Sequence, residues 1–116
     1  MEVKPFEASV RSQPGFAVID LYGEIDTFAE EALNRAYQQA SSQRPNTILL
    51  NFNGVDYINS KGIALIVGLL SQAQKEGCKL FVYGLSQHYV EIFNITRLSD
   101  FMNIYPDEVS ALAGVA

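Results

Sequence analysis

Ser60 is the residue whose type and neighbours are best suited to a chemical role. It lies between Asn59 and Lys61, with Gly62 next, just before a long apolar run. A serine at such a point is typical of a helix N-cap, because its hydroxyl can accept hydrogen bonds from free N–H groups of the first turn. Gly62 is costly inside a helical turn and is easier to explain if something approaches the backbone closely there. We therefore read Ser60 as a cap and Gly62 as a point of close contact.

Catalytic arrangements around Ser60 find little support in the sequence. Adjacent residues on a helix do not face each other, so Ser60 and Lys61 do not make a dyad. His88 is the only histidine, and the chain lacks a Gly-x-Ser-x-Gly nucleophile elbow. No cluster of metal ligands is visible, and the lone Cys78 suits a small core or edge position. We predict a protein that is not an enzyme and has no cofactor; a small hydrolase using Ser60 is the least favoured hypothesis.

The segments that must position Ser60 alternate between strand and helix. Strands are predicted at 6–11, 16–22, 47–52, 79–83 and 101–105, and helices at 27–42, 60–75, around 90–93 and from 107 onwards. For the first helix, Thr27 and Glu30 have capping-box spacing, and Asp26 is a rival cap. The order β-β-α-β-α-β-α-β-α predicts an α/β fold with a mostly parallel central sheet and an antiparallel edge strand.

Three predicted loops leave the same edge of that sheet. They are 23–26, 53–60 and 84–86, with Asn53-Gly54 expected to turn the chain. Parallel strands carry their carboxyl ends along one edge, where ligands and partners usually meet an open α/β sheet. Residues far apart in the sequence are therefore expected to form one surface there.

Three motifs in this order resemble the STAS domain. The segment 49–62 has an apolar-apolar-Asn-apolar strand, a short loop and then Asn59-Ser60-Lys61-Gly62, which is similar to the family's Asp-Ser-x-Gly motif before an apolar helix. Gly23-Glu24-Ile25-Asp26 resembles the family's Gly-Glu-hydrophobic-Asp motif, and 93–112 resembles its closing helix–strand–helix. The resemblance covers nearly the whole chain. It implies a single STAS domain over residues 1–116, of the anti-sigma-factor antagonist type.

The resemblance also implies a phosphorylation-controlled switch. In that family an anti-sigma factor, itself a serine kinase that binds ATP, phosphorylates the motif serine; the unphosphorylated domain sequesters this partner and frees the sigma factor. Carried over, Ser60 is the acceptor. The adjoining partner-binding surface contains Gly23, Glu24, Asp26, Thr27, Asn59, Lys61 and Gly62.

Two positions depart from the family motif and keep an alternative open. Asn59 stands in place of an acidic residue, and Lys61 in place of a small one. An amide cannot act as a carboxylate toward the serine hydroxyl, whereas a lysine attracts a phosphate or an acidic surface. The alternative is a STAS subunit that is not phosphorylated and binds constitutively, in a signalling scaffold or with a membrane transporter.

Composition restricts the possible partners. The chain has 116 residues and a formal net charge of −5, and its lysines and arginines are scattered singly. Nucleic acids and anionic membranes both require a concentrated positive patch, so neither is expected as a partner. One cysteine, no hydrophobic signal core, and a longest apolar run of 63–70 predict a cytoplasmic protein without direct membrane insertion.

Overall fold

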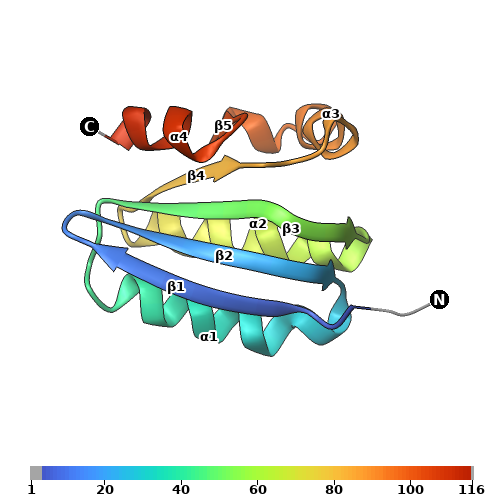
Figure 1. Cartoon of the computed structure of the whole chain (residues 1–116), viewed down its shortest axis with the longest axis horizontal. Helices are drawn as coiled ribbons and strands as arrows, with labels where there is room; N and C mark the ends of the chain where they lie inside the picture. The colour runs from blue at the N-terminus through green and yellow to red at the C-terminus, as the bar shows by residue number, and fades with distance from the viewer. Residues whose placement is uncertain (1–3, 116) are drawn as a thin grey trace.

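The computed structural model describes residues 4–115, which form five strands, four α-helices and two 3-10 turns. The strands are β1 (Glu7–Gln13), β2 (Phe16–Ile25), β3 (Thr47–Ile58), β4 (Lys79–Tyr83) and β5 (Asn103–Tyr105). The helices are α1 (Glu30–Ser41), α2 (Ser60–Lys75), α3 (Gln87–Ile95) and α4 (Glu108–Val115), and the turns are η1 (Thr27–Ala29) and η2 (Leu98–Asp100). The sheet order is β1-β2-β3-β4-β5, with β1 antiparallel to β2 and the other pairs parallel (Figure 1). The predicted fold class and element order are confirmed.

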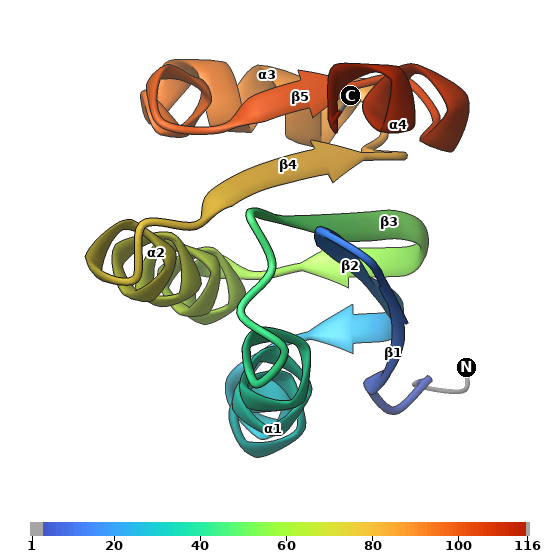
Figure 2. The same ribbon diagram turned by 90° about the vertical axis from the view of Figure 1, so that its left-hand side faces the viewer.

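The sheet separates two apolar layers of unequal size. The larger core lies on the face covered by α1, α2 and α3, where Ile19, Leu50 and Val82 of the strands are fully buried. The smaller cluster lies on the other face, where Val18, Leu49 and Phe81 pack beneath α4. Figure 2 shows α1 and α2 on one side of the sheet and α4 near β4 and β5. Alternate side chains of a strand point to opposite faces, so the central strands are apolar on both.

A cluster of polar side chains ties α4 to the sheet. Arg11 of β1 binds the buried Asp20 of β2 through two hydrogen bonds of 2.7 and 2.9 Å, and its guanidinium also donates to Glu108 of α4 at 2.7 Å. Asn51 of β3 donates to Asp20 at 2.7 Å, and the Tyr83 hydroxyl of β4 donates to Glu108. These five residues, here called the Arg11 cluster, join four strands and the last helix.

Two strands run further than the sequence predicts. β2 continues past Tyr22 to Ile25, and β3 continues past Phe52 to Ile58, so Asn53-Gly54 is not a turn. The parallel pairing persists through register shifts as far as Ile25 opposite Ile58. Gly23 accommodates one shift with a φ of 87°. The predicted loops at this edge are consequently shorter, and the candidate site begins directly at the strand ends.

The first helix begins later than predicted. Asp26 caps the η1 turn by accepting a 2.9 Å hydrogen bond from the backbone N–H of Phe28, and α1 starts at Glu30 instead of Thr27. The rival cap was therefore the correct one, and the capping box was wrong. The spacing of Phe28 with Ala32 and Leu33 is that of the apolar face of a helix, but Phe28 lies in the η1 turn and is 91% exposed.

The remaining boundaries differ by a few residues or agree. β1 runs on to Gln13, and β5 begins at Asn103 because residues 101–102 follow η2 in an irregular conformation. The predicted helix 60–75 and strand 79–83 are confirmed. Within residues 4–115, every helix is too short or too polar to cross a lipid bilayer.

Candidate functional site

Asn59, and not Ser60, caps the start of α2. The Asn59 side-chain oxygen accepts a 2.8 Å hydrogen bond from the backbone N–H of Gly62, and its carbonyl oxygen accepts from the N–H of Ile63 at 3.0 Å. The prediction of a Ser60 cap was wrong because the extended backbone of β3 continues through Asn59 before the helix begins. Ser60 becomes the first helical residue, with an exposed side chain.

The end of β2 holds the start of α2 in place. The Ile25 carbonyl oxygen accepts a 3.2 Å hydrogen bond from the Asn59 N–H. Gly62 is buried against the same carbonyl, and a Cβ atom at this position would collide with it. The close approach that the glycine indicated is therefore made by the chain itself. Gly62 shapes the site and offers no surface of its own to a partner.

Gly23 and Glu24 belong to the structural support of the same edge. Gly23 is buried beneath the backbone of Lys4 and Pro5, where a side chain would collide with the Pro5 carbonyl. The Glu24 N–H donates to the Lys4 carbonyl at 3.3 Å, and Glu24 pairs with Tyr57 on β3. Gly23 and Glu24 of the Gly-Glu-hydrophobic-Asp motif thus fix the path of the chain before it reaches Asp26.

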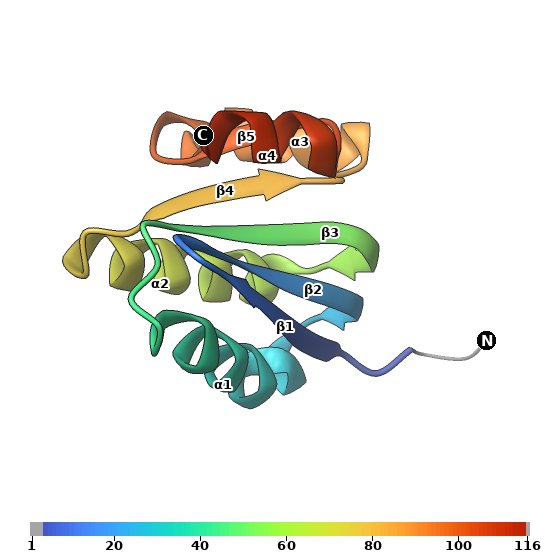
Figure 3. The same cartoon turned by 60° about the vertical axis from the view of Figure 1, so that its left-hand side comes forward.

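The exposed part of this edge combines two segments that are distant in the sequence. Figure 3 shows η1 and the start of α2 at the same end of the sheet, and the two elements contact each other. Thr27, Phe28, Ser60 and Lys61 are exposed there, and Asp26 and Asn59 are half-buried. We call these six residues the Ser60 surface. It presents hydroxyl groups, an ammonium group and an exposed aromatic ring, and aromatic residues are enriched in protein interfaces.

Sequence reasoning missed two residues of this region. Phe28 has apolar helical spacing with Ala32, and that spacing indicates a core position. Tyr57 lies on a part of β3 that was expected to be a loop, and it is 51% exposed. Phe28 lies in the η1 turn and not in an α-helix because Asp26, which competed in the sequence with Thr27, is the cap.

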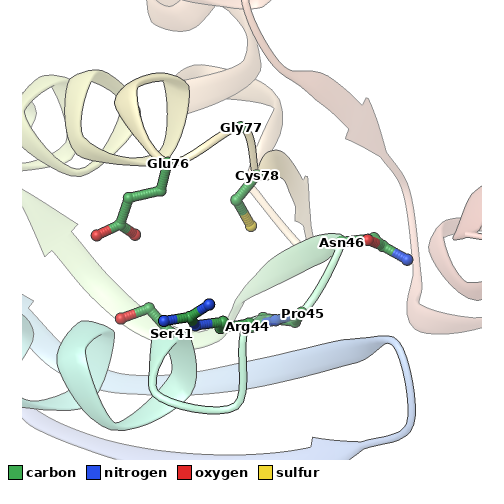
Figure 4. A pocket seen from close by; sticks show the side chains of 7 residues that line it. All are labelled: Ser41, Arg44, Pro45, Asn46, Glu76, Gly77 and Cys78. Carbon is green, nitrogen blue, oxygen red and sulfur yellow. The ribbon is translucent and has the colours of Figure 1, made fainter.

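A pocket lies at the other end of the strands from the Ser60 surface (Figure 4). It has a volume of about 420 Å³ and is lined by Ser41, Arg44, Pro45, Asn46, Glu76, Gly77 and Cys78. The Tyr37 hydroxyl donates to Glu76 at 2.7 Å beside it. Burial and the negative charge of Glu76 raise the pKa of the Cys78 thiol, so the thiolate needed for nucleophilic attack is disfavoured. No residue of the Ser60 surface lines this pocket, and among residues 4–115 no group of three acidic, histidine or cysteine side chains is arranged to hold a metal.

Residues 7–111 match the sequence profile of the STAS domain, and the chain belongs to this family. Membership agrees with the prediction of a binding protein that is not an enzyme. Among curated relatives, the anti-sigma-B factor antagonist of Staphylococcus aureus is 27% identical over 93 residues, which cover 80% of this chain and 86% of that protein.

Solved structures share the fold. An anti-sigma factor antagonist from Mycobacterium paratuberculosis has a TM-score of 0.81 at 22% identity, with 95% of this chain and 93% of that chain covered. The phosphorylated form of the Bacillus cell fate determinant SpoIIAA has a TM-score of 0.71 at 23% identity, covering 96% and 99% of the two chains. The unphosphorylated form of SpoIIAA has a TM-score of 0.70 at 19% identity, covering 94% of each chain.

Proposed function

We propose that this protein is an anti-sigma-factor antagonist that works in the cytoplasm. It binds an anti-sigma factor through the Ser60 surface, and that partner, a serine kinase with its own bound ATP, ends the interaction by phosphorylating Ser60. The observation that carries the proposal is the position of Ser60, which is exposed as the first residue of α2 while Asn59 forms the cap. Ser60 also resembles the motif serine of the STAS family, whose profile matches residues 7–111. The name of the Staphylococcus aureus relative supports the same role.

The physics of the site supports a switch that leaves the fold intact. A phosphate adds about −1.5 to −2 charge. At the start of α2 it would meet backbone N–H groups and the positive end of the helix dipole, which favour an anion. The two forms of SpoIIAA, with nearly equal TM-scores to this chain, are in keeping with a fold that tolerates phosphorylation. The same dianion inside an interface must be desolvated or repelled when the partner docks.

The neighbours of Ser60 have separate tasks in this proposal. Lys61, exposed beside the serine, meets acidic groups or the transferred phosphate. Phe28 supplies an aromatic anchor of the kind that often dominates binding energy. Asp26 holds the turn that presents Phe28. Asn59 orients the start of the helix.

The experiment compares wild type, Ser60→Ala and Ser60→Asp with the kinase that co-purifies from the native cells. Wild type is expected to incorporate phosphate when ATP is added and to lose the complex. Ser60→Ala is expected to bind without incorporating phosphate, and Ser60→Asp is expected to bind at least tenfold more weakly. Ser71→Asp is the matched control, because Ser71 is also exposed on α2 but lies three turns further along.

Two results would overturn the proposal. Undiminished binding by Ser60→Asp would exclude a switch based on charge at this position. A tight complex that ignores ATP, without phosphate on wild type, would establish the constitutive STAS subunit that Asn59 and Lys61 left open.

A further inference from the structure

The last part of β3 extends beyond the strand next to it. β3 pairs with β4 from Thr47 opposite Lys79 to Asn51 opposite Tyr83, and there β4 ends. β3 itself continues to Ile58, paired with β2 on its other side. Among residues 4–115, no strand lies next to the end of β3 on the β4 side to accept and donate backbone hydrogen bonds. Such groups need partners when they are buried.

The segment leading into α3 covers the end of β3 on its β4 side. At Gly84 the chain turns with a φ of 81° and its backbone lies against Asn53. Ser86 then caps α3 by accepting a 3.4 Å hydrogen bond from the Tyr89 N–H. The Tyr89 side chain lies in the larger core and is 9% exposed. Its ring thus points from the first turn of α3 toward the sheet.

The Tyr89 hydroxyl serves both backbone groups of Ile58. It accepts a 2.8 Å hydrogen bond from the Ile58 N–H and lies 3.3 Å from the Ile58 carbonyl oxygen, to which it donates. One phenol thereby does what a residue of an adjacent strand would do. Ile58 precedes the Asn59 cap directly, and the Asn59 N–H is held from the other side by Ile25. The junction between β3 and α2 is fixed from both sides.

We propose that Tyr89 is a positioning residue for the Ser60 surface: its hydroxyl substitutes for a missing strand and sets where α2 begins. The effect on the junction depends on the contacts just described. The effect on partner binding rests on the proposed function. Ser60 lies two residues beyond the held backbone, so a freed junction would let the serine and Lys61 move relative to Phe28, which belongs to η1 on the β2 side.

The test replaces Tyr89 by Phe, which keeps the buried ring and removes the hydroxyl. Tyr37→Phe is the matched control, because it also removes a hydrogen-bonded tyrosine hydroxyl. The Tyr37 hydroxyl bonds to the Glu76 side chain, far from the junction between β3 and α2. Amide hydrogen exchange by NMR is measured for both variants and wild type. Tyr89→Phe is expected to speed exchange at Ile58 and Asn59 at least tenfold, with no such change in Tyr37→Phe.

Affinity for the anti-sigma factor kinase is measured on the same samples at a temperature where all are folded. Tyr89→Phe is expected to bind at least fivefold more weakly than Tyr37→Phe. Unchanged exchange at Ile58 and Asn59 would overturn the proposal. So would faster exchange with wild-type affinity, provided that Ser60→Asp still weakens binding at least tenfold. If neither Tyr89→Phe nor Ser60→Asp affects binding, the proposed function fails while the backbone role of Tyr89 stands.

Discussion

The amide of Asn59 closes the first turn of α2 and leaves the neighbouring Ser60 with no structural task. We expect Asn59→Ala to lower the free energy of unfolding by about 1 kcal/mol, because an N-cap hydrogen bond is lost. Ser60→Ala is expected to change it by less than about 0.5 kcal/mol, as is usual for exposed positions. Urea denaturation of the two variants measures the difference. A Ser60→Ala loss as large as that of Asn59→Ala would mean that the serine contributes to the cap.

Phe28 is too exposed to contribute to the core, and in the proposed function its ring contacts the partner. We expect Phe28→Ala to leave the unfolding free energy within about 0.5 kcal/mol of wild type. Affinity for the anti-sigma factor is expected to fall about tenfold or more, as for aromatic residues at the centre of interfaces. Phe101→Ala is the control, since Phe101 is 60% exposed and lies before β5, outside the Ser60 surface. Equal effects of the two variants on affinity would contradict the assignment of the surface.

The sequence points to Ser60 as the key residue of the proposed site but does not define its surroundings. The serine was recognisable because a glycine and an apolar helix follow it in a family pattern. The cap was predicted at Ser60 and is formed by Asn59, since both side chains suit the position and only the path of β3 decides. Tyr89 carried no signal at all: its hydroxyl matters through a strand end 31 residues earlier in the chain.

Two glycines of α2 differ in what surrounds them, as the predicted close contact at Gly62 indicates. Gly62 touches the Ile25 carbonyl, whereas a Cβ atom at Gly68 would meet nothing within 4 Å. We expect Gly62→Ala to destabilise by about 1–3 kcal/mol through overpacking. Gly68→Ala is expected to stabilise by about 0.5–1 kcal/mol, because alanine is the better helix former. Thermal and urea unfolding of both variants tests this; a stabilising Gly62→Ala would exclude the contact with Ile25.

At the level of elements, the interiors were predictable and several ends were not. Apolar runs with helical or strand spacing located α2 and β4 correctly. Gly23 and Asn53-Gly54, by contrast, have the composition of turns and lie inside paired strands. They stay within strands because β2 and β3 pair with each other: the Tyr22 ring lies over Gly54, and the Lys4–Pro5 backbone covers Gly23. Such contacts between distant segments are not encoded in local spacing.

The Arg11 cluster makes the stability of the whole molecule depend on pH. Burial raises the pKa of the Asp20 carboxyl, but hydrogen bonds from Arg11 and Asn51 outweigh it and leave the pKa below its usual value. Hydrogen bonds from Arg11 and Tyr83 likewise lower the pKa of Glu108. A carboxyl with a lowered pKa in the folded state stabilises the fold above its unfolded pKa, and this contribution is lost as pH falls through the folded value.

We therefore expect the unfolding free energy to fall progressively as the pH drops below about 5, where unfolded carboxyls begin to take up protons. Glu108→Gln removes one of the linked groups, so its stability is expected to be lower at neutral pH and less dependent on pH than that of wild type. Urea titrations at several pH values measure both slopes. Glu31→Gln is the control, because Glu31 forms an exposed pair with Arg35 on α1. Parallel pH curves for wild type and Glu108→Gln would contradict the role of the cluster.

The contact between Arg11 and Glu108 also has a consequence for how the protein is made. The two residues are 97 positions apart, and α4 is synthesised after every strand of the sheet. Domains generally fold as units during synthesis, so the packing of β1 to β4 is incomplete until α4 has been made. Until α4 arrives, Val18, Leu49 and Phe81 remain uncovered on the second face. A chain stalled on the ribosome before α4 would thus expose an apolar sheet face to chaperones and proteases. Synthesis of α4 covers that face.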